Sequence, residues 1–257
     1  MGVLNRILEQ KRSELARWRT ARLPAPPVRR PVRLARVPGQ GLRLICEIKR
    51  RSPSAGRLSA KLGITERARA YERGGAAMVS VLCDTEFFDG AYEHLSEARA
   101  GCSLPLLCKE FVIDEAQLDA ARAYGADAVL LIARCVDVAQ LSLLVRAARE
   151  RELEPFVEIA SEQERRHALD TGATLIGVNA RDLDTLAMDV QAAARLLDAL
   201  PADVTAAHFS GLHGAPDVAR VARSRADAAL VGEALMRLDD PEPLLRELVS
   251  AALPEDG

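Results

Sequence analysis

The chain has 257 residues, of which 49% are hydrophobic and 28% charged, and its formal net charge is −2. This length suits one large domain or two small ones, with ample surface to bury a core. Balanced charge and only 4% aromatic residues argue against nucleic-acid binding, which needs a basic surface and rings for base stacking. No apolar run approaches the roughly 18 residues of a membrane-spanning helix, so we expect no membrane association.

Cysteine and histidine usage points to a reducing compartment without a metal site. The five cysteines are odd in number and contain no C-x-x-C pair, and the four histidines show no close ligand spacing. The N-terminus also lacks the long apolar core of a secretory signal. A cytoplasmic protein is the simplest interpretation.

The N-terminal segment predicts a helix followed by an irregular connector. Apolar residues recur with mostly helical spacing over residues 2–20, as in an amphipathic helix. Residues 24–41 then hold five prolines and two glycines, which disfavour regular structure. We expect residues 1–42 to form an extension packed on the main body, residues 43–257, within a single domain overall.

From residue 43 onward, short apolar strands alternate with helical stretches. The predicted strands lie at 43–49, 77–83, 104–109, 127–133, 155–159, 174–179, 204–209 and 228–232. Predicted helices between them include 65–73, 115–124, 138–151, 162–170 and 190–199. Several helices end on a small residue that precedes the next strand, as in ERGGAAMV and AYGADAVL.

Eight strands alternating with helices predict a parallel α/β fold, and eight is the closing number of a (β/α)8 TIM barrel. An open, doubly wound sheet is the rival architecture. It usually carries a G-x-G-x-x-G turn after its first strand, whereas here that turn reads RRSPSAG. We therefore expect the barrel.

The first predicted strand carries opposite charges on one of its faces. Side chains alternate along a strand, so Ile45, Glu47 and Lys49 share one face. The other face is apolar and consists of Leu44, Cys46 and Ile48. Charges that end a hydrophobic strand, just before Ser-Pro-Ser, are unusual for a purely structural element.

Polar residues recur at the same end of other strands, where a barrel builds its active site. The set comprises Glu47, Lys49, Lys109, Glu158, Asn179 and Arg181. One charge at a strand end is usually solvated and needs no explanation. Six polar residues at one end indicate a site, because buried charges are costly unless they are paired.

Glycines after the last two strands add a second kind of signal. Ser210-Gly211 follows one strand, and Gly232-Glu233 follows the next. Either glycine alone would be an ordinary turn residue. Barrels often bind phosphate at this location through backbone N–H groups, so a phosphorylated small-molecule substrate is expected.

The motifs resemble one known family, that of indole-3-glycerol-phosphate synthase, over nearly the whole chain. They are EIKRRSPSAG at 47–56, SVLCDTEFFDGAYEHL at 80–95, LLCKEF at 106–111, PFVEI at 155–159, IGVNARDL at 176–183, FSGL at 209–212 and VGEALMR at 231–237. The resemblance implies a (β/α)8 barrel of tryptophan biosynthesis. Members convert 1-(o-carboxyphenylamino)-1-deoxyribulose 5-phosphate to indole-3-glycerol phosphate, losing carbon dioxide and water, without a metal or organic cofactor.

The resemblance also implies roles for individual residues. Lys109 matches the general acid that protonates the ketone oxygen as the ring closes, and Glu158 matches its partner in the later dehydration. The residue types suit this chemistry independently, because ring closure onto a carbonyl and expulsion of hydroxide each need a positioned proton donor.

Other positions match binding groups of the family. Lys49 matches a lysine that contacts substrate carboxylate or phosphate, and Glu47 the glutamate that orients it. Asn179 and Arg181 match a polar pair that supports the carboxylate end and the catalytic lysine. The expected substrate-binding walls and phosphate cradle are formed by Ser52, Phe111, Leu130, Leu230, Ser210, Gly211, Gly232 and Glu233. Ser52-Pro53-Ser54 is expected to begin a loop that covers the substrate.

Three positions depart from the family pattern. Phe209 stands where the family usually has a glutamate, Ala160 where it commonly has a histidine, and Ala234 where it commonly has a serine. Drift at positions that only tune the chemistry would leave the ordinary activity intact. The alternative is a paralogue of secondary metabolism, with an altered substrate or reduced activity.

Two further alternatives come from other classes. A sugar isomerase barrel would share the phosphate cradle, but it would ordinarily place paired acid/base carboxylates or a Cys–Asp pair at the first and fifth strands. Here the first strand offers Glu47 with Lys49, and the third strand adds Lys109, so the pattern fits poorly. A non-catalytic barrel that binds a phosphorylated ligand would have no reason to retain Lys109 and Glu158. The family default is a monomer, with a weak dimer as the alternative.

Overall fold

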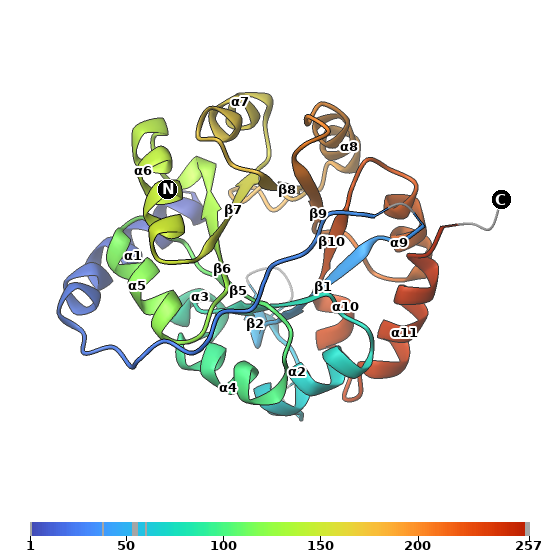
Figure 1. Ribbon diagram of the computed structural model, residues 1–257, viewed down its shortest axis with the longest axis horizontal. Helices are drawn as coiled ribbons and strands as arrows, with labels where there is room; N and C mark the ends of the chain where they lie inside the picture. The colour runs from blue at the N-terminus through green and yellow to red at the C-terminus, as the bar shows by residue number, and fades with distance from the viewer. Residues whose placement is uncertain (1, 38, 53–55, 60, 255–257) are drawn as a thin grey trace.

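The computed structural model describes residues 2–37, 39–52, 56–59 and 61–254. Eight parallel strands close into a barrel in the order β1-β10-β9-β8-β7-β6-β5-β4, with helices around the outside (Figure 1). The predicted (β/α)8 fold is therefore confirmed. No helix among the described residues is both long and apolar enough to cross a membrane.

The barrel strands fall where the apolar runs predicted them, within one or two residues. They are β1 (Arg43–Ile48), β4 (Met78–Leu82), β5 (Leu106–Lys109), β6 (Ala128–Ile132), β7 (Glu154–Ile159), β8 (Leu175–Asn179), β9 (Thr205–Phe209) and β10 (Ala228–Val231). A small antiparallel hairpin, β2 (Arg51–Ser52) with β3 (Gly56–Arg57), follows β1. Residues 53–55 lie outside the described part, so the predicted substrate-covering loop is described only at its two ends.

Helices connect successive barrel strands, and α11 follows the last one. The longer ones are α2 (Ile64–Arg73), α4 (Glu93–Gly101), α5 (Glu115–Ala123), α6 (Val138–Glu150), α7 (Glu162–Asp170), α8 (Val190–Asp198), α9 (Ala215–Ala222) and α11 (Glu242–Ala251). Short helical turns form α3 (Thr85–Phe88), η1 (Ala133–Cys135) and α10 (Glu233–Met236). Helices α4, α9 and α11 were not predicted from the sequence.

The two faces of the barrel wall pack against different partners. Leu44, Cys46 and Ile48 of β1 belong to the apolar layer between the strands and the outer helices. Ile45, on the other face, packs inside the barrel with residues such as Leu107. The alternation predicted for the first strand is confirmed, and it places Glu47 on the interior face.

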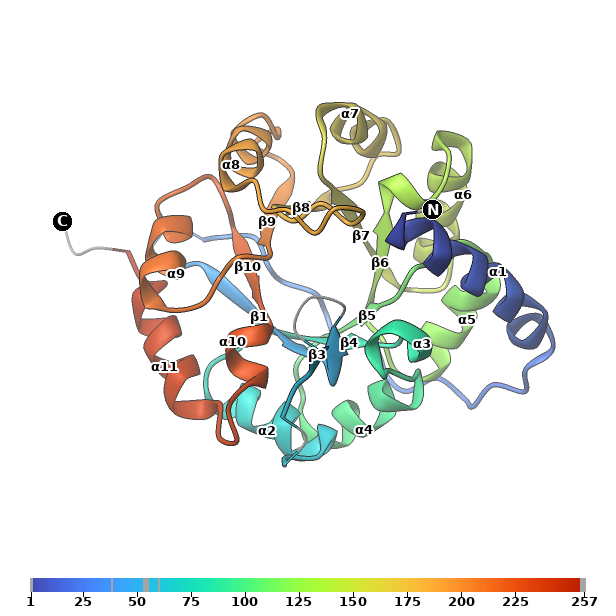
Figure 2. The ribbon, with the colours of Figure 1, turned by 180° about the vertical axis from the view of Figure 1, so that it is seen from behind.

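Helix α1 (Val3–Thr20) lies across the C-terminal ends of the strands on the β5–β6 side (Figure 2). Its residues Leu4, Ile7 and Leu8 are buried in the same apolar cluster as the barrel interior. The helix therefore extends the core beyond the strand ends and forms part of the barrel mouth.

The connector after α1 crosses to the opposite end of the barrel (Figure 1). The backbone N–H of Arg30 bonds to Asp127 at 2.5 Å, and that of Arg36 bonds to Asp227 at 3.1 Å. These aspartates immediately precede β6 and β10, and Leu34, which lies between Arg30 and Arg36 in sequence, is buried in the interior cluster. The N-terminal extension thus contacts both ends of the barrel.

Candidate active site

A cavity opens at the C-terminal ends of the strands, where the sequence placed the site. It encloses about 1140 Å³, counting the solvent at its mouth. All the site residues predicted from the sequence line it: Glu47, Lys49, Ser52, Lys109, Phe111, Leu130, Glu158, Asn179, Arg181, Ser210, Gly211, Leu230, Gly232 and Glu233. Their roles stay predictions, but the structure brings them to one place.

A chain of polar contacts links Lys109 on β5 to Ser210 after β9. The Lys109 Nζ lies 3.3 Å from Glu158 Oε2, and the Asn179 side-chain amide donates to Glu158 Oε1 at 3.0 Å. Asn179 Oδ1 in turn accepts hydrogen bonds from the Ser210 hydroxyl and the Arg181 backbone N–H. Two donors at Oδ1 fix the orientation of the amide, so its NH₂ group must face Glu158.

Strand register explains why these residues meet. Glu158 of β7 pairs with Gly177 of β8, and Asn179 of β8 pairs with Phe209 of β9. Glu158, Gly177, Asn179 and Phe209 have the parity of the interior face, since β-strand side chains alternate. The chain from Lys109 to Ser210 is therefore built on rigid strand ends.

A second ion pair lies on β1. The Lys49 Nζ is 2.6 Å from Glu47 Oε1, and the Glu47 side chain is only 3% exposed. Burial opposes ionisation of Glu47, but the ammonium groups of Lys49 and Lys109 outweigh it and hold the pKa of this carboxyl below its ordinary value. Glu47 is therefore an anion between two cations.

The glycine at position 232 makes room for this pair. A Cβ at Gly232 would lie 2.6 Å from Glu47 Oε1, closer than a Cβ carbon approaches an atom to which it is not bonded. Gly232 therefore has a packing role at the site in addition to its predicted place in the phosphate cradle.

The turn after β9 has an uncommon backbone. Ser210 and Gly211 both have positive φ angles, 71° and 77°, which sharply redirects the chain. Opposite it, Glu233 begins α10, and its carboxylate lies 2.6 Å from Arg237 at the end of the same helix. The hydrogen bond from Arg237 lowers the pKa of Glu233. This salt bridge offsets the negative charge of Glu233, which would otherwise repel an anionic ligand.

Phe209 is almost fully buried at the floor of the cavity. Its ring centroid lies 5.1 Å from the Phe156 centroid and 5.4 Å from the Lys109 Nζ. A Cβ at Gly177 would come within 2.6 Å of the ring, so the ring rests directly on the glycine backbone. An aromatic face thus occupies the position where the sequence resemblance leads one to expect a carboxylate.

An apolar wall completes the cavity, and the sequence revealed only part of it. Phe111, Leu130 and Leu230 were predicted, whereas Val3, Ile7, Leu82, Phe88, Ile132, Leu183, Leu186 and Leu212 were not, nor were Glu110 and His213. Val3 and Ile7 come from α1, whose helical pattern indicates an apolar face without saying what it covers. Neither Ala160 nor Ala234 is among the described residues that line the cavity.

Fold and site together define a (β/α)8-barrel enzyme whose charged residues meet at the C-terminal ends of the strands. The family model described as indole-3-glycerol phosphate synthase matches residues 4–248, and the chain belongs to this family.

Relatives agree over nearly the full length. The chain is 40% identical to an indole-3-glycerol phosphate synthase of an Exiguobacterium species over 253 residues, which cover 98% of each chain. It is 41% identical to indole-3-glycerol phosphate synthase 2 of Streptomyces coelicolor, covering 96% of this chain and 99% of the relative.

Similar solved structures reflect the fold alone. Thiamine phosphate pyrophosphorylase from Pyrococcus furiosus has a TM-score of 0.63 at 17% identity, covering 82% of this chain and 95% of its own. The 3-hexulose-6-phosphate synthase from Salmonella typhimurium has a TM-score of 0.61, also at 17% identity, covering 82% and 98%.

Proposed function

We propose that this chain is an indole-3-glycerol-phosphate synthase, a carboxy-lyase of tryptophan biosynthesis. It would convert 1-(o-carboxyphenylamino)-1-deoxyribulose 5-phosphate to indole-3-glycerol phosphate with loss of carbon dioxide and water. The observation that carries the proposal is the pair of Lys109 and Glu158, 3.3 Å apart at the floor of the cavity. The names and near-complete coverage of the relatives support it.

Lys109 acts in the first step as the general acid. The ring carbon that bears the carboxylate attacks the ketone carbon, and the ammonium group gives a proton to the ketone oxygen, which becomes a hydroxyl. Carbon dioxide then leaves and its electron pair restores the aromatic ring. Glu158, held by Lys109 and by the Asn179 amide, is placed to exchange protons with the ammonium group between turnovers.

Dehydration completes the reaction. The new hydroxyl leaves as water after protonation, and a proton is lost so that the indole double bond forms. A carboxyl and an ammonium group in contact can serve as the base and the acid of this step, because each can return the proton that the other receives. The side chains supply both proton transfers, and we propose that the enzyme uses no metal or organic cofactor.

Different residues of the cavity are suited to bind different parts of the substrate. Lys49 and Arg181 provide cations for the anthranilate carboxylate before it is lost, and Glu47 orients Lys49. Phe111 and Leu130 provide an apolar wall for the aromatic ring. The backbone around Ser210–Gly211 and Gly232–Glu233 provides N–H donors for the phosphate.

The direct test is the fluorescence assay for indole-3-glycerol phosphate formation by the purified protein. We expect turnover by the wild type and a loss of about a hundredfold or more in kcat for Lys109→Ala, because a general acid typically contributes 10²–10⁴-fold. A wild type that bound the substrate and formed no product would contradict the proposal and leave a non-catalytic phosphate-binding barrel or a paralogue with another substrate.

Phe209 favours a second candidate function. It removes a carboxylate from the floor of the cavity and places a ring against Lys109. A paralogue that acts on a modified anthranilate adduct, or that works slowly in secondary metabolism, would fit this change. We propose the ordinary activity first, because the contacts among Lys109, Glu158 and Asn179 are made without any group from position 209.

The remaining features of the proposal concern setting and assembly. We propose a cytoplasmic enzyme that acts as a monomer, which is the default that the family resemblance implies. Size-exclusion chromatography with light scattering, at several protein concentrations, would distinguish the monomer from a weak dimer.

A further inference from the structure

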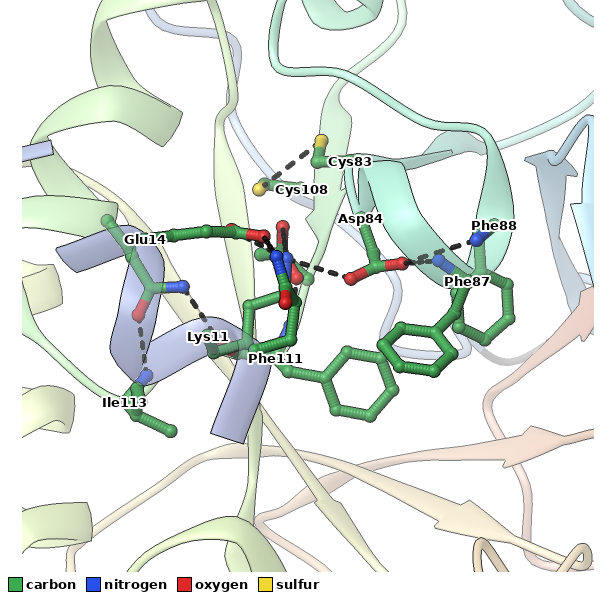
Figure 3. A network of polar contacts seen from close by, with 12 residues as sticks. Lys11, Glu14, Cys83, Asp84, Phe87, Phe88, Cys108, Phe111 and Ile113 are labelled. Carbon is green, nitrogen blue, oxygen red and sulfur yellow. Dashed lines mark hydrogen bonds and ion pairs between the residues drawn. The ribbon is translucent and has the colours of Figure 1, made fainter. Parts of the chain in front are cut away.

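A buried ionic cluster lies beside the cavity and is centred on Lys11 of helix α1 (Figure 3). The Lys11 side chain is only 1% exposed. Its Nζ lies 2.8 Å from Asp84 Oδ2 and 3.0 Å from Glu110 Oε2. A third carboxylate, that of Glu14 on the next turn of α1, lies 3.1 Å away. One ammonium group therefore contacts three carboxylates from three segments of the chain.

The two barrel carboxylates also hold backbone groups, each through its other oxygen. Asp84 Oδ1 accepts hydrogen bonds from the N–H groups of Phe87 and Phe88, at 2.7 and 3.2 Å, and so caps helix α3. Glu110 Oε1 accepts one from the N–H of Phe111 at 2.7 Å. Lys11 is thus linked through single side chains to the backbone of both segments.

Each segment that Lys11 joins contributes to the wall of the cavity. Helix α1 provides Val3 and Ile7, and α3 provides Phe88. The end of β5 provides Phe111, whose ring centroid is 6.1 Å from that of Phe88, and Glu110 directly follows the candidate general acid Lys109 in sequence. Displacement of Lys11 would therefore shift both Phe88 and Phe111, which form the aromatic wall of the cavity.

Stability alone explains this cluster poorly. Burying a lysine with carboxylates costs desolvation energy that the ion pairs often only offset, and apolar residues of similar size usually serve stability as well or better. The cost is visible at Glu110, where burial raises the pKa to about 7 despite the nearby Lys11 ammonium. The cluster brings little net stability, but it holds three segments of the chain in fixed positions relative to one another.

We propose that Lys11 is a positioning residue of the active site. Through Asp84 and Glu110, it fixes the Phe88–Phe111 wall and the end of β5 relative to α1, and so sets where Lys109 stands against the substrate. Lys11 is not among the described residues that line the cavity, so it acts through these partners. The proposal rests on the proposed function for its activity readout.

A triple variant that neutralises all three groups, Lys11→Met, Asp84→Asn and Glu110→Gln, tests the proposal. The two introduced amides each keep an oxygen for the backbone N–H groups, and the three buried charges are removed together. The matched control is Arg19→Met, which breaks an exposed ion pair between α1 and Asp114 at 2.5 Å, away from the cavity.

We expect the triple variant to keep a melting temperature within a few degrees of the wild type while kcat/KM falls at least tenfold. In single and double variants, the losses in kcat from Lys11→Met and Glu110→Gln should be non-additive, because the two residues act as one link. Arg19→Met should retain kcat/KM and combine additively. A folded triple variant within twofold of the wild-type kcat/KM would overturn the proposal.

Two further readouts keep the test decisive. If the triple variant fails to fold, the single variant Glu110→Gln is used in its place. We expect its kcat/KM to fall at least threefold, and an unchanged kcat/KM would overturn the proposal.

Amide hydrogen exchange at residues 85–88 and 111–113 is a readout that needs no turnover. It should accelerate in the triple variant and not in Arg19→Met, and unchanged exchange in both would refute the link. A wild type without synthase activity would refute the proposed function and leave the exchange result to decide the link.

Discussion

The ammonium group of Lys109 lies over the ring of Phe209, 5.4 Å from the ring centroid. A cation above an aromatic face is attracted by the ring electrons, although more weakly than by a carboxylate in direct contact. Lys109 therefore has one carboxylate in direct contact, Glu158, and one aromatic neighbour on the floor of the cavity. This contact is the chief local difference from the family pattern.

Phe209→Glu tests what this difference does. The variant replaces a packed ring by a buried carboxylate, and we expect the free energy of unfolding to fall by about 2–4 kcal/mol. Denaturant unfolding measures that loss, and the fluorescence assay measures turnover. Under the proposed function the wild type is already active with the ordinary substrate. A wild type without turnover and a Phe209→Glu variant with it would instead show that Phe209 blocks the ordinary reaction and would contradict the interpretation of position 209 as drift.

Asn179→Asp should impair catalysis with little effect on folding. The change replaces an NH₂ group that donates to Glu158 at 3.0 Å by a second carboxylate, so a hydrogen bond becomes a repulsion. We expect kcat to fall ten- to a hundredfold in steady-state assays. Ser210→Ala, which removes a donor to Asn179 without changing the charge next to Glu158, should cost clearly less. Equal losses in the two variants would contradict the role assigned to the amide.

Gly177→Ala should destabilise the protein through Phe209. The added methyl group would lie about 2.6 Å from the ring, so the ring must move away from its place beside Phe156. Overpacking of this kind costs about 1–3 kcal/mol in the free energy of unfolding. Combining Gly177→Ala with Phe209→Leu, which shortens the side chain, should recover part of that loss. No recovery in the double variant would show that the strain lies elsewhere.

Glu110 should make stability depend on pH. Its pKa is about 7 in the folded protein, against an ordinary value of 4.5, because burial and the Asp84 carboxylate outweigh the Lys11 ammonium and the Phe111 N–H. The folded state therefore binds more protons than the unfolded state between pH 4.5 and 7. The free energy of unfolding contributed by this group falls as pH rises through that window, by about 3 kcal/mol at most.

The measurement is urea unfolding of the wild type and of Glu110→Gln from about pH 4.5 to about pH 8, a range that brackets both pKa values. The variant cannot ionise at this position, so its stability relative to the wild type should increase with rising pH and level off above pH 7. A constant difference between the two proteins across the range would contradict the expectation. Other carboxyl groups titrate in both proteins, so the comparison isolates position 110.

The sequence predicted the barrel and the polar ends of several strands well, because both depend on local pattern. Short apolar runs define the strands, and a charge such as Lys109 marks where some of these runs end. In a parallel barrel all such ends lie at one mouth, so the placement of Glu47 and Glu158 follows from topology alone.

The rest of the site could not be predicted because it depends on contacts distant in sequence. Lys11 looks like an ordinary charged residue of an amphipathic helix, and its partner Glu110 lies 99 residues away. Gly177 looks like any strand glycine until the ring of Phe209 is placed upon it. Helix α1 was expected to pack on the barrel, but an amphipathic pattern does not specify which surface it covers.

The N-terminal extension has a consequence for how the chain is made. The contact of Leu4 with Asp184 spans 180 residues, and that of Arg36 with Asp227 spans 191. Residues of the extension are therefore synthesised well before Asp184 and Asp227, their partners in these contacts. Contacts of such long sequence separation form slowly. The apolar face of α1 must stay exposed at least until β5 and β6 have been made, because it packs against residues of these strands, so α1 should dock after them.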